Sequence, residues 1–169
     1  MKRYALRAKN LINNIMKTGE KAPDFTLKNQ NNEEISLKDY KGKKVLLVFY
    51  PKDDSPVCST QLCEYSKGLN DFDELGINIL AISTDSAESH RAFTEKRNIR
   101  FQLLSDAKQQ VSKSYGVLGV FGFTKRAVIL IDEEGNILYE NVKLPVFYQK
   151  KTELIETIKS LIKSKQSEK

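Results

Sequence analysis

The chain has no apolar run of the roughly 18 residues that a membrane-spanning helix needs. Near its start it also lacks the apolar core of about 7–15 residues that a secretory signal carries. We therefore expect a cytoplasmic protein that has no membrane partner and works in a reducing compartment. In such a compartment a spaced cysteine pair is more often catalytic or metal-binding than a structural disulfide.

Cysteine and histidine are scarce in this chain. It has two cysteines, Cys58 and Cys63, and one histidine, His90. The cysteines do not form the C-x-x-C pair of dithiol–disulfide oxidoreductases, which disfavours that class without removing it. Structural zinc normally takes four ligands, and two cysteines with one histidine supply only three. This set therefore argues against a zinc site. We expect no metal and no cofactor, and we expect His90 on an exposed helix surface without a catalytic role.

The positive charge of the chain is concentrated at its two ends. The net charge is +6, yet residues 1–21 carry six Lys or Arg against one Glu, and residues 143–169 carry seven Lys against three Glu. The middle of the chain is therefore net acidic. A protein that binds nucleic acid usually gathers its basic residues on one folded face. We expect no nucleic-acid partner.

The length of 169 residues fits one domain with an ordinary core. We place that domain at residues 17–164, followed by a polar tail at 165–169. Residues 1–16 form a basic extension with apolar residues at helical spacing, which is consistent with a short amphipathic helix. A start-site extension or a docking helix is a better interpretation of this segment than an organelle-targeting peptide, which usually contains Ser.

Strand and helix patterns alternate through the middle of the chain. Residues 43–50 form a continuous apolar run, typical of a strand that is buried on both faces. The other expected strands are 22–27, 34–37, 77–83, 101–104, 126–132 and 136–141, and the expected helices are 56–75, 86–97, 108–115 and 152–163. Ser86 is the expected N-cap of the second helix. This order predicts an α/β protein with a central mixed sheet flanked by helices, similar to the thioredoxin-like architecture.

Cys58 falls where an expected buried strand passes into an expected helix. The reactive form of cysteine is the thiolate, which a helix N-terminus favours. Asp53 and Asp54 would oppose ionisation, whereas a hydroxyl at Ser55 could donate a hydrogen bond to the sulfur. Arg126 begins a strand that is expected to be buried, and a guanidinium keeps its charge there. We therefore expect Cys58 as a solvent-accessible thiolate close to Arg126.

The spacing of the two cysteines forbids a bond between them while the helix is regular. Residues five apart in a helix have Cα atoms roughly 8–9 Å apart, whereas a disulfide needs about 4.4–6.8 Å. If Cys58 and Cys63 do bond, the first turns of the helix must unwind, which suits a cycle of oxidation and local unfolding. For Cys63, which falls near the apolar stripe, simple packing remains an alternative.

The segment Pro51-x-x-x-Ser55-x-x-Cys58 resembles the active-site signature of the peroxiredoxins, Pro-x-x-x-Thr/Ser-x-x-Cys. The spacing from Cys58 to Cys63 is similar to that of the peroxiredoxin Q branch, also called bacterioferritin comigratory protein. Further segments that resemble the family, in the same order along the chain, are residues 21–27, 49–54, 82–86, 88–90, 103–106, 115–117 and 125–126. The resemblance covers about residues 17–160.

The resemblance implies a thiol-dependent peroxidase that reduces hydrogen peroxide and organic hydroperoxides in antioxidant defence. Cys58 would be the peroxidatic cysteine, and Cys63 would resolve its sulfenic acid as an intramolecular disulfide that a thioredoxin-type dithiol reduces. Ser55 would hold the peroxide, Pro51 would shield the site, and Arg126 would stabilise the thiolate. The branch is often monomeric. A dithiol–disulfide oxidoreductase and a non-catalytic binding module on the same fold remain the alternatives.

Overall fold

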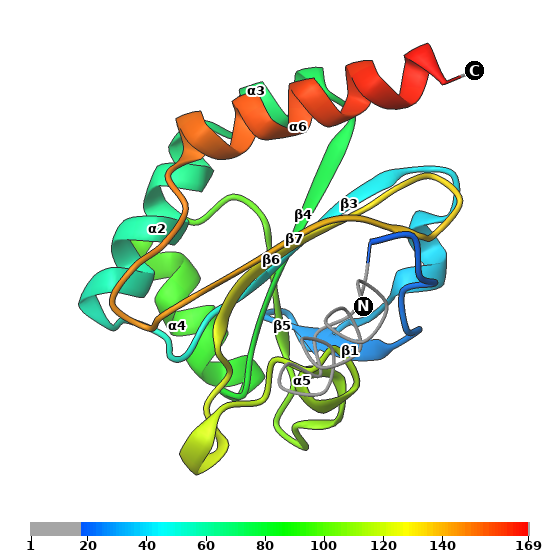
Figure 1. Cartoon of the computed structure of the whole chain (residues 1–169). Helices are drawn as coiled ribbons and strands as arrows, with labels where there is room; N and C mark the ends of the chain where they lie inside the picture. The colour runs from blue at the N-terminus through cyan, green and yellow to red at the C-terminus, as the bar shows by residue number, and fades with distance from the viewer. Residues whose placement is uncertain (1–17, 169) are drawn as a thin grey trace, which may run out of the picture.

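A computed structural model describes residues 18–168, in which seven strands form one mixed sheet (Figure 1). The strands lie in the order β2-β1-β5-β4-β3-β6-β7. Within it, β3 pairs with β4 and β4 pairs with β5 in parallel, and the remaining pairs are antiparallel. The strands are β1 (Thr26–Asn29), β2 (Glu34–Ser36), β3 (Lys44–Phe49), β4 (Ile77–Ser83), β5 (Gln102–Ser105), β6 (Arg126–Ile131) and β7 (Ile137–Lys143).

Helices cover both faces of this sheet, as the alternating pattern predicts. The helical segments are η1 (Leu37–Tyr40), α2 (Pro56–Lys67), α3 (Leu69–Glu74), α4 (Ala87–Arg97), α5 (Gln110–Ser114), η2 (Val120–Gly122) and α6 (Lys151–Ser167). Side chains alternate along the central strand β3, so Leu46 and Val48 face one buried cluster while Leu47 and Phe49 face another. The first cluster lies under α2, α3, α4 and α6, and the second lies under α5 and η1. The α/β sandwich with a thioredoxin-like arrangement is confirmed.

One helix predicted over residues 56–75 is two helices in the structure. Gly68 ends α2, and its N–H donates to the carbonyl of Glu64 at 3.1 Å. A side chain at Gly68 would collide with that of Lys151, which comes from the start of α6. The apolar spacing continues across Gly68, so the periodicity of the sequence does not reveal the break.

The last helix is longer than predicted. Residues 165–167, expected as part of a polar tail, continue α6. The Lys165 ammonium lies 2.9 Å from a carboxylate oxygen of Asp132 and 2.9 Å from one of Glu134. Lys165 donates hydrogen bonds to these two carboxylates, and they raise its pKa above the ordinary value. The predicted helix over residues 1–16 lies outside the described residues.

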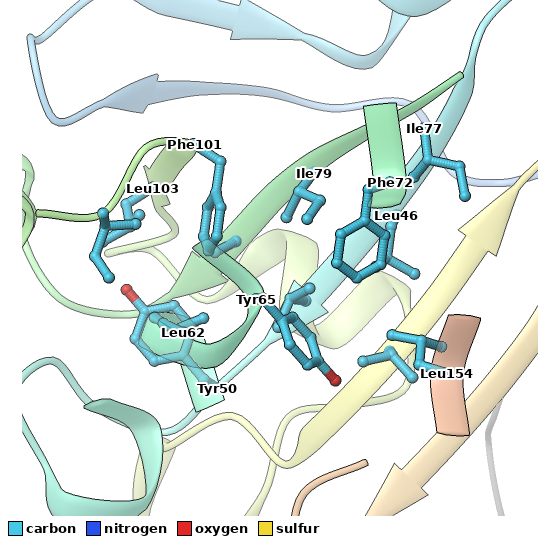
Figure 2. Close-up of a cluster of buried hydrophobic side chains, with 14 of the residues drawn as sticks. Leu46, Tyr50, Leu62, Tyr65, Phe72, Ile77, Ile79, Phe101, Leu103 and Leu154 are labelled. Carbon is cyan, nitrogen blue, oxygen red and sulfur yellow. The ribbon is translucent and has the colours of Figure 1, made fainter. Parts of the chain in front are cut away.

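Helix α2 packs its inward face onto the sheet, which carries the cysteine segment into the core. Figure 2 shows the aromatic and aliphatic side chains of this cluster. Leu62 and Tyr65, from α2, are fully buried among strand side chains that include Leu46, Ile79 and Leu103. Cys58 belongs to the same cluster. Within residues 18–168, no helix has the length and apolar character that crossing a bilayer requires.

Replacing Glu140 with Gln is expected to stabilise the protein at pH 8 but not at pH 5. Half-burial on β7, and to a smaller extent Glu20, raise the pKa of Glu140 to about 7. Because the folded pKa is the higher one, stability falls as pH rises from about 4.3, the unfolded value, to about 7. Thermal unfolding should give E140Q a Tm about 2 °C above wild type at pH 8.

The matched control is E156Q, because Glu156 is an exposed residue of α6. Its Tm should equal that of the wild type at both pH values. A gain for E140Q of the same size at pH 5 would contradict the assigned cause, since the protonated Glu140 and Gln are both neutral.

Candidate active site

The candidate site lies at the junction of β3 and α2. Ser55 is the N-cap of α2 in an extended conformation, and Pro56 occupies the first helical turn, where its missing N–H costs nothing. Cys58 also lies in this first turn. Its sulfur therefore stands at the positive end of the helix, where the amide groups favour an anion. Cys58 and Cys63 are both free and both lie in the same unbroken helix.

Arg126 brings a buried positive charge to this sulfur. Its side chain begins β6, is 2% exposed, and donates from Nη2 to the Sγ of Cys58 at 3.2 Å. The same guanidinium donates to Gln61 Oε1 at 2.7 Å and to the carbonyl of Pro145 at 2.8 and 3.1 Å. In the described part of the chain no carboxylate pairs with Arg126. The guanidinium thus places a buried positive charge directly against the sulfur of Cys58.

The structure corrects the expectation that Cys58 is open to solvent. Cys58 is 0% exposed and lies in the hydrophobic cluster under α2. The reason is its position on the inward face of the helix, four residues before Leu62, which is also fully buried. In this conformation the sulfur of Cys58 has no exposed surface.

Ser55 also differs from its expected position. Its hydroxyl donates to the carbonyl of Lys52 at 3.1 Å instead of to the sulfur of Cys58. The tight loop supplies a nearer acceptor, and a serine hydroxyl has a single proton to donate. Pro51 lies half-buried directly after β3. The structure thus brings Cys58 and Arg126 together, while Ser55 and Pro51 line the loop that leads to them.

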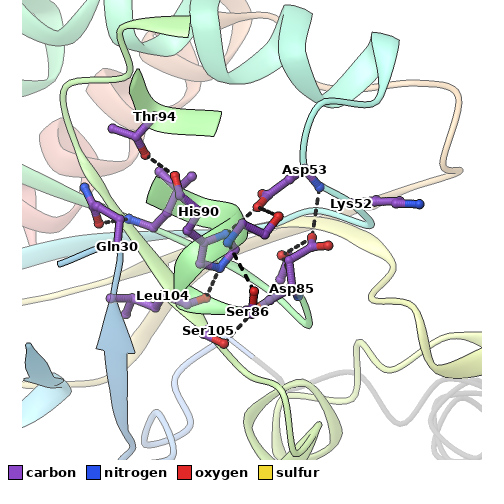
Figure 3. Close-up of polar contacts among 12 residues, drawn as sticks. Gln30, Lys52, Asp53, Asp85, Ser86, His90, Thr94, Leu104 and Ser105 are labelled. Carbon is purple, nitrogen blue, oxygen red and sulfur yellow. Dashed lines mark hydrogen bonds and ion pairs between the residues drawn. The ribbon is translucent and has the colours of Figure 1, made fainter. Parts of the chain in front are cut away.

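A buried polar network holds this loop in place (Figure 3). Asp53 is 7% exposed and accepts three hydrogen bonds, from Tyr50 Oη at 2.6 Å, Ser89 Oγ at 2.7 Å and His90 Nδ1 at 2.8 Å. The backbone N–H of Asp53 donates to Asp85 Oδ2 at 2.9 Å. The residue is thereby fixed to α4 and to the end of β4.

The prediction of an exposed His90 is wrong. Its side chain is 0% exposed, and its two ring nitrogens face Asp53 Oδ2 at 2.8 Å and the carbonyl of Leu104 at 3.0 Å. Both ring nitrogens of His90 therefore have buried hydrogen-bond partners. Helical spacing carried the missed signal, because His90 lies three residues before the buried Phe93 on α4.

The neighbouring Asp54 ties the loop to the other end of α4. Its carboxylate pairs with Lys96 at 2.5 Å and with Arg97 at 2.8 Å. Hydrogen bonds from these two side chains hold the pKa of Asp54 below its ordinary value. Asp54 also has a positive φ of 56°, which is uncommon outside glycine and is maintained by these contacts. The loop before α2 is therefore clamped at two successive residues.

No group of three or more His, Cys, Asp and Glu side chains in residues 18–168 is arranged to hold a metal ion. Cys63 lies one turn beyond Cys58 and is partly exposed on the side of α2 that faces the end of α4.

Known proteins resemble this chain in sequence and in fold. The AhpC/TSA family matches residues 18–140. A putative peroxiredoxin bcp of Coxiella burnetii is 43% identical over 129 residues, which cover 72% of this chain and 85% of that protein. Peroxiredoxin Bcp of Bacillus subtilis is 37% identical over 85% of this chain and 95% of its own. The reduced 2-Cys peroxiredoxin of Plasmodium vivax superposes with a TM-score of 0.83 at 29% identity, covering 89% of this chain and 99% of that one.

The family match and these relatives define a thiol peroxidase of the peroxiredoxin class. The chain belongs to the AhpC/TSA family, and within it to the Bcp and peroxiredoxin Q branch.

Proposed function

We propose that Cys58 is the peroxidatic cysteine of this peroxidase and acts on hydrogen peroxide and small organic hydroperoxides. The thiolate attacks the O–O bond, forms a sulfenic acid and releases water or an alcohol. The contact that supports this proposal is Arg126 Nη2 at 3.2 Å from the sulfur, in a site where that guanidinium has no carboxylate partner among the described residues. The same cation would stabilise charge on the peroxide oxygens in the transition state.

We propose that Cys63 then resolves the sulfenic acid. Its thiol attacks the sulfur of Cys58, expels water and leaves an intramolecular Cys58–Cys63 disulfide, which a thioredoxin-type dithiol reduces. Because both residues belong to α2, the first turns of this helix must unwind before the sulfurs meet. Ser55 and Pro51 complete the proposed site, with the Ser55 hydroxyl turning from the Lys52 carbonyl to the peroxide. A cytoplasmic monomer remains our prediction.

The test of this function is a coupled assay. Purified protein, thioredoxin, thioredoxin reductase and NADPH are mixed, and NADPH oxidation is followed after addition of hydrogen peroxide or an alkyl hydroperoxide. The proposal expects turnover that depends on both the protein and thioredoxin. Peroxide loss no faster than in the mixture without the protein would refute the peroxidase.

Replacing Arg126 with Gln is expected to lower kcat/KM for peroxide by about 10²–10³-fold, the usual effect of removing one preorganised electrostatic donor. The substitution removes the cation that faces Sγ but keeps polar donors for Gln61 and Pro145. The measurement is the second-order rate of thiol oxidation at pH 7, with circular dichroism to confirm the fold. The neighbouring exposed residue supplies the control, since K125Q should react like wild type. A folded R126Q with unchanged kcat/KM would contradict the role given to Arg126.

A further inference from the structure

The large apolar side chains that residues 18–168 expose lie in two loops. One loop contains η2 and precedes β6, and the other directly follows β7. The exposed residues are Val120, Phe121 and Phe123 in the first loop and Leu144, Val146 and Phe147 in the second. Single apolar side chains are ordinary on a protein surface, but a group of them marks an interaction site. We call these six residues the loop surface.

The two loops leave the sheet at the same end. Arg126, the first residue of β6, pairs with Lys143, the last residue of β7, so the loops start side by side (Figure 1). The Arg126 guanidinium also donates to the carbonyl of Pro145 at 2.8 and 3.1 Å. In the other loop the hydroxyl of Thr124 donates to the carbonyl of Tyr50, directly after β3. The loop surface therefore adjoins the candidate active site.

The backbone of the first loop holds an aromatic ring outward at a cost in free energy. Phe121 has a φ of 62° and a ψ of 21°, a left-handed conformation that is uncommon for a bulky residue. The turn is closed by the N–H of Gly119, which donates to the carbonyl of Phe123 at 2.7 Å. Phe121 is 91% exposed, so packing within the described chain offsets almost none of this cost. Burial of the ring against another surface would offset it.

The rim of the loop surface is basic. Residues 115–131 and 141–152 contain no Asp or Glu. The carboxylate that the structure ties to the second loop, that of Glu64, already accepts the hydroxyl of Tyr148 at 2.5 Å. The exposed lysines of these two segments, which none of the ion pairs in the described residues includes, are Lys125, Lys143 and Lys150.

This combination suits a membrane surface better than a second copy of the chain. In a two-fold symmetric dimer the same patch lies on both sides of the contact. The lysines of one copy would then face those of the other, with no carboxylate in either segment to pair with them. Anionic headgroups attract each nearby lysine, and the layer beneath them accepts apolar side chains.

We propose that the loop surface docks the protein onto a bilayer that contains anionic lipid. Phe121 and Phe147 enter below the headgroups, and Lys125, Lys143 and Lys150 lie among them. A surface contact of this kind needs no membrane-spanning segment, so the proposal departs from the expectation of no membrane partner. It places the candidate active site at the membrane surface, and it does not depend on the chemistry assigned to the two cysteines.

A single tryptophan tests the contact directly, because the chain contains none. F121W places it in the first loop. K163W is the control, because Lys163 is exposed in the C-terminal half of α6 and α6 runs away from both loops (Figure 1). Fluorescence of the full-length proteins is recorded with vesicles of phosphatidylcholine, and with vesicles of phosphatidylcholine and phosphatidylglycerol in equal amounts.

The emission of F121W should move to shorter wavelength with the anionic vesicles only. The shift should shrink severalfold in about 1 M salt, which screens the lysines from the headgroups. The emission of K163W should stay where it is without lipid. An unshifted F121W, or an equal shift in K163W, would overturn the proposal.

Cosedimentation with the anionic vesicles measures the contribution of each group. The basic ends of the chain can also attract anionic lipid, so loop variants are compared with a matched change elsewhere. The double variant F121S/F147S should lower the partition coefficient by about tenfold or more through lost apolar burial. K125Q should lower it by about fivefold, the equivalent of about 1 kcal/mol for one lysine at an anionic surface.

The control K163Q removes the same charge from α6 and should stay within about twofold of wild type. Circular dichroism confirms that each variant is folded, as expected for changes at exposed side chains. A partition coefficient that is unchanged in the loop variants, or that falls as much in K163Q as in K125Q, would overturn the proposal.

A second copy on the loop surface would give different results. Sedimentation velocity without vesicles would then show a dimer that F121S/F147S converts to a monomer, and the emission of F121W would be at short wavelength before lipid is added. These results would overturn the membrane contact and assign the loop surface to a dimer interface. We expect a monomer in which F121W emits as an exposed tryptophan until anionic vesicles are added.

Discussion

Replacing Cys58 with Ser is expected to lower peroxide turnover by at least about a thousandfold, because the reaction loses its nucleophile. Replacing Cys63 with Ser should have a different effect. C63S keeps the thiolate and Arg126, so one equivalent of peroxide should still be consumed per protein. Turnover with thioredoxin should then stop, because no intramolecular disulfide forms for the reductant to open.

The two variants are measured together, first by peroxide consumption in the coupled assay and then by mass spectrometry. In C63S the mass of the peptide that contains Cys58 should increase by one or two oxygen atoms, as a sulfenic or sulfinic acid. The two variants control for each other, since each removes one thiol from the same helix. Full activity in C58S, or no oxidised form of Cys58 in C63S, would be incompatible with the assigned roles.

The second large effect concerns stability. His90→Phe is expected to lower the free energy of unfolding by about 3–5 kcal/mol, because two buried hydrogen-bond partners of the ring, Asp53 and the carbonyl of Leu104, are left unsatisfied, each at a cost of about 1–3 kcal/mol. Asp53 would keep its hydrogen bonds from Tyr50 and Ser89 but lose the imidazole in a site that is 7% exposed. For a chain of this size the Tm should fall by about 10 °C.

Asp53→Asn should cost less, because asparagine keeps a side-chain oxygen that can accept from Tyr50 and an amide that can still bond the ring of His90. The control lies on the same helix, where Arg91 and Glu95 form an ion pair that is about two-thirds exposed on both side chains. Arg91→Ala should change stability by less than about 0.5 kcal/mol. Urea unfolding at pH 7 gives all three values. An H90F stability within that same margin of wild type would show that the buried pair contributes nothing.

Elements that depend on local chemistry were predictable from the sequence. The apolar run at residues 43–50 is the buried strand β3, and Ser86 caps α4 by accepting the N–H of Ser89 at 3.1 Å. The strand-to-helix position of Cys58 is also found, because strand and helix each have a clear period. The proximity of Arg126 followed from a simple physical expectation, that a charged residue at the start of a buried strand needs an anion or an acceptor nearby.

What the sequence did not reveal depends on contacts between distant segments. His90 is buried because Asp53, 37 positions earlier, supplies a carboxylate for it. At Gly68, where α2 ends, the side chain of Lys151 from the last helix packs closely, and the periodicity within residues 56–75 does not contain that information. The burial of Cys58, by contrast, was contained in the helical spacing, because it lies four residues before the fully buried Leu62 on α2.

Hydrogen exchange of the reduced and peroxide-oxidised protein, read peptide by peptide in a sample whose disulfide has been mapped, tests the central claim most directly. That claim has two parts. The sulfur held against Arg126 reacts with peroxide, and the oxidised sulfur then bonds to Cys63 only after the start of α2 opens. The account predicts a Cys58–Cys63 disulfide and faster exchange confined to residues 55–63, with residues 64–67 as protected as before. A disulfide formed with no change in exchange across residues 55–63, or one that joins two chains, would contradict it.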